Sequence, residues 1–139
     1  MGDRHNIGIM LYPNEDEQAK EILWLYAHNG FWTDVVDGYA ASLAHALDEA
    51  RPRWGDYQYF NRIIILTLSD SIRGIGIGTA TGDEHKRYVL DPKRQIVHLM
   101  DNWSWNGDCR HMPSPIVSFT YDEFVSRYRK HERTVRGEY

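Results

Sequence analysis

Ile22-Leu23-Trp24-Leu25-Tyr26-Ala27-His28 is an apolar run whose side chains alternate between two faces, so it predicts a β-strand. Residues 5–12 alternate in the same way, through Ile7, Ile9 and Leu11. A polar turn at residues 13–18 separates the two runs. We therefore expect an antiparallel β-hairpin at the start of the chain.

After this hairpin the apolar period lengthens to three or four residues, which is typical of helices. The first apolar stripe consists of Val35, Val36, Tyr39, Ala40, Leu43 and Leu47. Thr33 or Asp34 is suited to cap this helix, and Pro52 should end it. Asp56 is suited to cap a second helix, although residues 63–65 are β-branched and also fit a strand. The second apolar stripe consists of Tyr57, Phe60, Ile64 and Leu68.

The second half of the chain returns to strands. Residues 74–78, 87–90 and 95–100 each alternate or are apolar, and residues 102–115 form a long irregular loop. A last helix then starts at a capping box, Thr120 with Glu123, next to a hydrophobic staple, Phe119 with Phe124. The order ββ-αα-βββ-α predicts an α+β fold: an antiparallel sheet of about five strands with helices packed on one face.

Composition limits the class of protein. The chain has 139 residues, of which 42% are hydrophobic and 26% charged, so we expect one globular domain over residues 1–139. A net charge of -4 makes nucleic acid an unlikely direct partner. Cys109 is the only cysteine, and the longest apolar run, residues 63–66, is too short to cross a bilayer. With no apolar leader after Met1, we expect a cytoplasmic protein without a membrane partner.

Aromatic and arginine side chains crowd residues 51–62, and both types are favoured at recognition surfaces. Two further tryptophans lie in the loop at residues 102–115. The candidate partner-binding residues are Trp32, Arg51, Arg53, Trp54, Tyr57, Trp103 and Trp105. The alternative is that Arg53 and Arg62 pair with Asp56 or Asp48 at a helix junction. The aromatic surplus is also compatible with a homodimer.

His28 follows a strand and is the one candidate for a catalytic base, with Asp34 or Asp56 to orient it. The alternative is a structural histidine packed against Trp24 or Trp32. No serine or cysteine forms a convincing nucleophile–base pair with it. Possible metal ligands do occur together, but their spacing matches no known kind of site, so we expect no metal and no cofactor. They are Asp101, Asp108, Cys109 and His111.

Several segments of the first half resemble small uncharacterised proteins encoded by tailed phages and prophages. The segments are Arg4-His5-Asn6-Ile7, Tyr26-Ala27-His28-Asn29-Gly30, Arg53-Trp54-Gly55-Asp56-Tyr57 and Arg62-Ile63-Ile64. In that group tryptophan directly follows the histidine, whereas this chain has Asn29. A second resemblance, of residues 88–91 and 118–124, is to toxin-immunity proteins of the SMI1/KNR4 type.

The resemblance to phage proteins implies a biological context, a phage in its bacterial host, but no particular reaction. Small phage proteins without a catalytic constellation usually bind a host protein, often to inhibit a defence system in the manner of anti-CRISPR or anti-restriction proteins. We therefore expect a binding protein that acts on a host protein complex in the bacterial cytoplasm, more readily than an enzyme. The alternatives are a small enzyme that acts on a nucleotide or protein with His28 as base, and a toxin-immunity protein.

Overall fold

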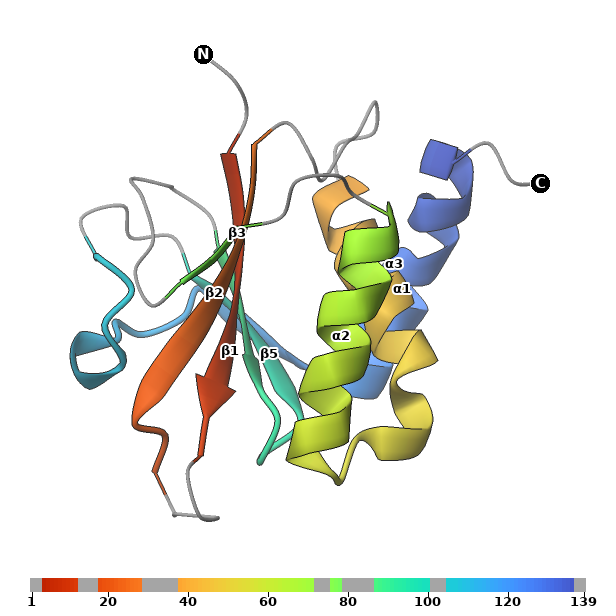
Figure 1. Ribbon diagram of the computed structural model, residues 1–139. Coiled ribbons are helices and arrows are strands. Elements are labelled where there is room, and N and C mark those ends of the chain that lie inside the picture. Colours follow the sequence, from red (N-terminus) through yellow and green to blue (C-terminus); the bar gives the residue numbers. More distant parts are fainter. Residues whose placement is uncertain are drawn as a thin grey trace.

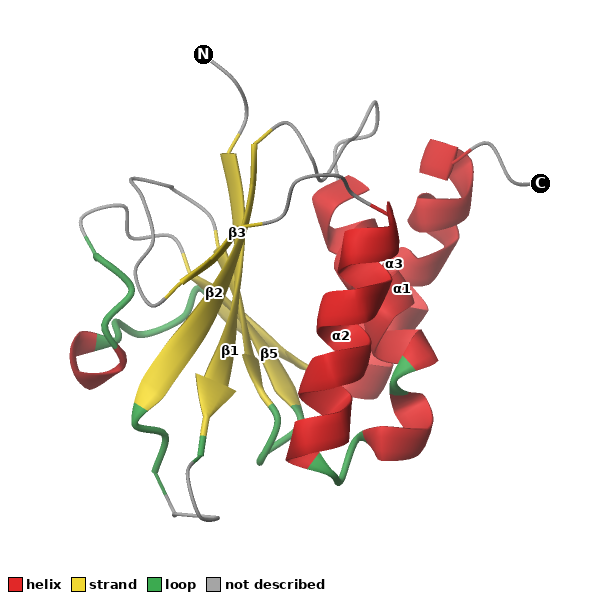
Figure 2. Cartoon of the chain, viewed as in Figure 1, coloured by secondary structure: helices red, strands yellow, loops and turns green. Residues whose placement is uncertain are grey.

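The computed structural model describes residues 4–12, 18–28, 38–71, 76–78, 87–100 and 105–136. Six strands form one sheet, and three α-helices and two short 3-10 turns complete the described elements (Figures 1 and 2). The strands are β1 Arg4–Leu11, β2 Glu21–His28, β3 Gly76–Gly78, β4 Arg87–Asp91, β5 Ile96–Met100 and β6 Val117–Thr120. The helices are α1 Gly38–Glu49, α2 Tyr57–Ser71 and α3 Tyr121–Arg136, and the 3-10 turns are η2 Arg51–Arg53 and η3 Cys109–His111.

The sheet has the strand order β3-β2-β1-β4-β5-β6. The expected hairpin is present, with Ile7 of β1 opposite Leu25 of β2 in an antiparallel register. At the centre of the sheet, however, β1 runs parallel to β4, and Ile7 lies beside Tyr88. The α+β class is confirmed, but the prediction of a purely antiparallel sheet is wrong. Alternation identifies a strand but carries no information on the direction of a neighbour far along the chain.

The three helices cover one face of the sheet, and α1 contacts both α2 and α3 (Figure 1). The alternating apolar residues of β1 and the apolar stripe of α2 pack into the same core. Ile7 and Ile9 of β1 and Phe60 and Ile64 of α2 are all fully buried there. Three residues of the apolar stripe predicted for α2, Phe60, Ile64 and Leu68, are buried, whereas Tyr57 is only partly buried. Residues 63–65 are helical rather than extended. Burial of these side chains is the main driving force for the layer arrangement.

The other face of the sheet is covered by the segment that contains η3, which Figure 1 shows on the side opposite the helices. Trp24 is the centre of this second core. Its ring lies 5.6 Å from the ring of Trp105 at 70°, and its indole N–H donates to the carbonyl of Gly107 at 3.1 Å. Val89 and Met100 complete the cluster. The segment predicted as an irregular loop is therefore fastened to the sheet by buried side chains.

The start of α3 forms as the sequence predicts. The Thr120 N–H donates to the Glu123 carboxylate at 2.8 Å, and the Glu123 N–H donates to the Thr120 hydroxyl at 3.1 Å. Phe119 and Phe124 meet with ring centroids 5.5 Å apart. Strand β6 was not predicted, because its four residues run directly into this helix start and their side chains are mostly exposed. β6 pairs antiparallel with β5 and forms an edge of the sheet.

Gly8 provides a test of how closely the second core packs. A Cβ atom at this position would lie 2.7 Å from Cγ2 of Ile22 and 2.9 Å from Cζ3 of Trp24. We predict that Gly8→Ala lowers the free energy of unfolding by about 1–3 kcal/mol, the usual cost of overpacking a core. At Gly55 nothing lies within 4 Å of an added Cβ, so Gly55→Ala is the matched control and should not destabilise. Urea denaturation of both variants measures the difference, and equal stabilities would contradict the packing described here.

Candidate functional site

The crowded segment from Arg51 to Tyr57 forms the junction between α1 and α2. Pro52 lies at the start of η2, where a missing backbone N–H is tolerated, and it prevents α1 from continuing. The carbonyl of Asp56 accepts the Phe60 N–H at 2.8 Å, so Asp56 occupies the N-cap position of α2, as predicted. The junction therefore has a defined geometry, and its side chains point in different directions.

Trp54 turns inward from this junction. Its indole N–H donates to the carbonyl of Leu47 at 2.9 Å, near the end of α1. Its ring meets the buried ring of Tyr121 with centroids 5.1 Å apart at 72°. Trp54 is only partly buried. These contacts tie η2 to both α1 and α3, which is a structural role that the sequence alone did not distinguish from a binding role.

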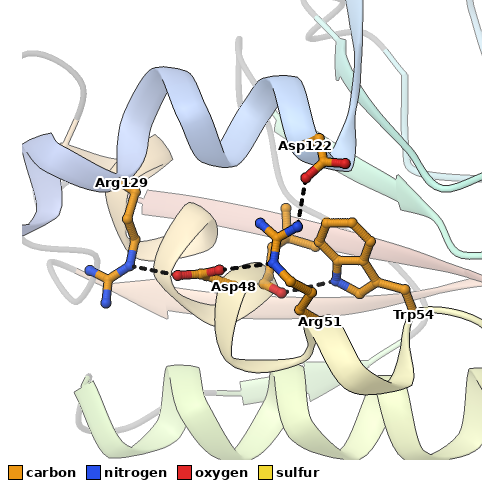
Figure 3. A network of polar contacts seen from close by, with 6 residues as sticks. Asp48, Arg51, Trp54, Asp122 and Arg129 are labelled. Atoms are coloured by element: carbon orange, nitrogen blue, oxygen red, sulfur yellow. Dashed lines mark hydrogen bonds and ion pairs between the residues drawn. The ribbon is translucent and has the colours of Figure 1, made fainter.

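Arg51 holds the outer side of the same junction (Figure 3). Its guanidinium contacts Asp122 of α3 at 2.6 Å and Asp48 of α1 at 3.2 Å, and it lies 4.5 Å from the centre of the Trp54 ring. The hydrogen bond to Asp122 is the main cause that raises the pKa of Arg51. Arg129 of α3 also reaches Asp48, at 3.4 Å. Because these groups are substantially exposed, each pair contributes little stability and the network mainly fixes orientation.

Arg53 contacts Tyr59 of α2 and Asp56 at its N-cap, rather than α1 and α3 as Arg51 does. Its guanidinium lies 4.8 Å from the centre of the Tyr59 ring, and its ion pair with Asp56 is long, at 3.9 Å. The predicted alternative, in which Arg53 pairs with Asp56, is thus present. The carboxylate of Asp48 is contacted by Arg51 and Arg129. Arg53 and Tyr59 remain about half exposed, so this side of the junction is available to a partner.

Tyr57 borders a cavity of about 880 Å³ between the turn end of the β1–β2 hairpin and the start of α2. Its ring lies 5.9 Å from the ring of Tyr12, at 43°. The lining residues are Met10, Leu11, Tyr12, Lys20, Glu21, Gly55, Asp56, Tyr57, Gln58 and Asn61. Aromatic faces, amides and charges of both signs alternate around the cavity, which suits hydrogen-bonded recognition of a polar or peptide-like group.

Beside this cavity lies a polar group that the sequence did not predict, in which Tyr12 and Asp91 are buried and Arg94 is exposed. The phenol of Tyr12 donates to the carboxylate of Asp91 at 2.7 Å, and the Arg94 guanidinium contacts the Tyr12 oxygen at 3.0 Å and the carboxylate at 3.4 Å. Burial, followed by the contacts with Asp91, raises the pKa of Tyr12 well above the usual value for tyrosine. The only sequence signal was the turn at residues 91–94, because Tyr12 is distant in the sequence. The group fixes the β4–β5 turn against the end of β1.

Among the remaining predicted site residues only Trp105 has a described side chain, and it does not join this junction. Trp105 is 6% exposed and donates its indole N–H to the carbonyl of Asp108 at 2.9 Å, so its ring belongs to the second core rather than to the surface. Trp32 and Trp103 lie outside the described residues. His28 is the last residue of β2, with its Cα opposite that of Arg4, and its side chain lies outside the description.

Two further properties concern the described residues only. Within residues 4–12, 18–28, 38–71, 76–78, 87–100 and 105–136, no three His, Cys, Asp or Glu side chains come close enough to hold a metal ion. Asp108 instead accepts from the Arg110 N–H at 3.0 Å and lies 2.7 Å from Nδ1 of His111. None of the helices in that part of the chain combines the length and the hydrophobicity needed to span a bilayer.

Comparisons with known proteins give no match to this chain, whether against family models, curated proteins or solved structures. The resemblances to phage proteins and to immunity proteins therefore stay predictions from the sequence. The structural features that bear on function are the geometry of the junction and the cavity beside it.

Trp54 tests the structural role of the junction. We predict that Trp54→Phe, which removes the indole N–H and leaves the Leu47 carbonyl without that donor, costs about 1 kcal/mol of unfolding free energy. Trp54→Ala also removes the contact with Tyr121 and should cost about 3 kcal/mol. Arg53→Ala, at the exposed side of the same junction, should change stability by less than about 0.5 kcal/mol. Urea denaturation measures the free energy of unfolding of all three variants. If Trp54→Ala leaves it unchanged, the indole does not stabilise the junction.

The raised pKa of Tyr12 leads us to predict that the free energy of unfolding decreases at alkaline pH. Because its pKa is raised in the folded protein, the unfolded chain releases the phenol proton first, and stability falls as the pH rises above the usual tyrosine pKa. By pH 11 this contribution amounts to about 1 kcal/mol relative to pH 8. Tyr12→Phe should be less stable at pH 8 but should lack this part of the alkaline slope, whereas Tyr59→Phe should retain it. Urea denaturation at each pH measures the free energy of unfolding. If it falls equally with pH in the wild type and in Tyr12→Phe, the ionisation of Tyr12 is not linked to folding.

Proposed function

We propose that this chain is a small phage-type accessory protein that binds and inhibits a host macromolecular complex. In this proposal the target is a bacterial defence system of the CRISPR or restriction type, and the protein acts in the cytoplasm of the bacterial host. The observation that supports binding is the η2–α2 junction, where Arg53 and Tyr59 are about half exposed and Tyr57 borders a cavity of about 880 Å³.

Preorganisation makes this surface suited to recognition. Arg53 is already stacked on Tyr59, so less side-chain freedom is lost when a partner binds. The backbone beneath it is held by Trp54, which contacts α1 through Leu47 and α3 through Tyr121. Aromatic and arginine residues on a rigid base are the composition that dominates the energetics of protein interfaces.

A protein target fits the charges better than a nucleic acid does. The net charge of -4 opposes binding to phosphate backbones over the whole surface. Arg51 and Arg53, two of the arginines crowded into residues 51–62, also have carboxylates beside them in the folded chain. The proposal therefore takes a host protein, not DNA or RNA, as the direct partner.

The test is a pull-down from bacterial lysate with the tagged chain, with and without nuclease, read by mass spectrometry. We predict one stoichiometric host complex that survives nuclease and whose activity falls when the purified chain is added. The double variant Arg53→Ala, Tyr57→Ala should weaken this binding by at least about 2 kcal/mol if the pair forms a hot spot. Arg110→Ala, on η3 at the other side of the sheet, is the control and should bind as the wild type does.

Failure of the proposal has a clear signature. If the chain retains no complex, or if every retained protein is released by nuclease, it does not act on a host protein complex. If a complex is retained but keeps full activity at saturating amounts of the chain, binding stands and inhibition is wrong.

A further inference from the structure

The outer face of α2 carries a stripe of recognition-type side chains. Tyr59 and Leu66 are 48% and 55% exposed, which is high for large apolar side chains, and Arg62 is exposed between them. These three positions, spaced i, i+3 and i+7, lie on one side of an α-helix. We call this set, Tyr59, Arg62 and Leu66, the α2 stripe.

The α2 stripe points away from the core. Phe60, Ile64 and Leu68 form the buried face of α2, and at 100° per residue the stripe is centred about half a turn from them. A surface helix is normally polar on its outer side. Here an aromatic ring and a leucine occupy that side instead, in addition to the half-buried Ile63 beside them. Large apolar side chains on both the inner and the outer side are typical of a helix that is covered on both sides.

The spacing of the stripe matches one known mode of recognition. An amphipathic helix that docks into a groove presents anchors at i, i+3 or i+4, and i+7. Tyr59 and Leu66 have the size and chemistry of such anchors, and Arg53 extends the stripe by stacking on Tyr59. A partner groove that accepts this helix must therefore be apolar at two points about two helical turns apart.

Charge selects between a second copy of this chain and a different protein. In a two-fold contact the centre of the patch faces its own copy. The centre of the α2 stripe is Arg62, so a homodimer through this face would bring two guanidinium groups together, which is unfavourable. Within the described residues, no carboxylate lies within ion-pair distance of Arg62. A partner with a carboxylate opposite Arg62 supplies the complementary charge.

We infer that the α2 stripe is a helix-in-groove docking surface for a protein partner whose apolar groove carries aspartate or glutamate at its rim. This inference rests on the proposed function, because it names the face and the partner chemistry through which the host complex would be bound. Leu66 and Tyr59 enter the groove, Arg62 pairs with the rim, and Arg53 supports the Tyr59 ring from the side.

The experiment uses the host complex retained by the wild-type chain as the probe, and measures its affinity for purified variants. Leu66→Ala and Tyr59→Ala should each weaken binding by about tenfold or more. Arg62→Glu should weaken it at least as much, because it places like charges together, and Arg62→Lys should restore most of the affinity. The matched control is Ile116→Ala, since Ile116 is 57% exposed next to the edge strand β6 rather than on α2, and should change affinity by less than about twofold.

A second readout identifies the partner chemistry. In the Arg62→Lys variant a carbodiimide can join the new amine directly to a carboxylate, so the cross-linked partner peptide should contain the rim aspartate or glutamate. Light scattering of the free chain should show a single copy.

Each contrary result has its own meaning. If the complex is retained and all α2 variants bind equally well, the docking face is wrong and the proposed function stands. If the free chain is a dimer that Leu66→Ala dissociates, the stripe is occupied by a second copy and the inference is overturned. If the wild-type chain retains no complex at all, both the inference and the proposed function fail.

Discussion

The packing of one buried ring, that of Tyr121, joins the parts of the helical layer to the sheet. It stacks on Phe60 of α2 with centroids 5.4 Å apart and meets Trp54, the residue after η2, edge-on at 5.1 Å. Its backbone N–H donates to the carbonyl of Gln95, at the β4–β5 turn, at 3.2 Å. Burial raises the pKa of its phenol well above the ordinary range. The position of the η2–α2 junction, and of the side chains that it displays, therefore depends on the packing of this ring.

Sequence patterns succeed where the information is local. The capping box Thr120–Glu123 and the staple Phe119–Phe124 are contacts between near neighbours, so their residue types were enough to predict them. The buried stripe of α2 follows from helical periodicity alone. The parallel pairing of β1 with β4 joins residues some eighty positions apart, and nothing in either strand encodes it. Strand β6 was missed because an exposed edge strand of four residues has no apolar alternation to recognise.

Only the local part of the candidate site could be predicted from the sequence. Residue types identified the segment Arg51 to Tyr57 as unusual, but not which side chain faces inward. That choice is made by tertiary contacts: Leu47 and Tyr121 attract the Trp54 indole, while Asp122 holds Arg51. The indole of Trp105, expected at the surface, instead fills the second core against Trp24. The Tyr12–Asp91–Arg94 group is assembled from distant parts of the chain and could be seen only in three dimensions.

The capping box at the start of α3 has a consequence beyond the helix. The N–H of Tyr121 faces β5, so in extended backbone the preceding N–H, that of Thr120, points away from β5 toward the open side of the sheet. That outward donor is already bound to the Glu123 carboxylate at 2.8 Å. An unpaired strand edge is a template for association with strands of other chains, which can lead to aggregation. Glu123, in the first turn of α3, thus also shields the sheet: it removes a donor that an incoming strand would need and places a negative charge where that strand would have to lie.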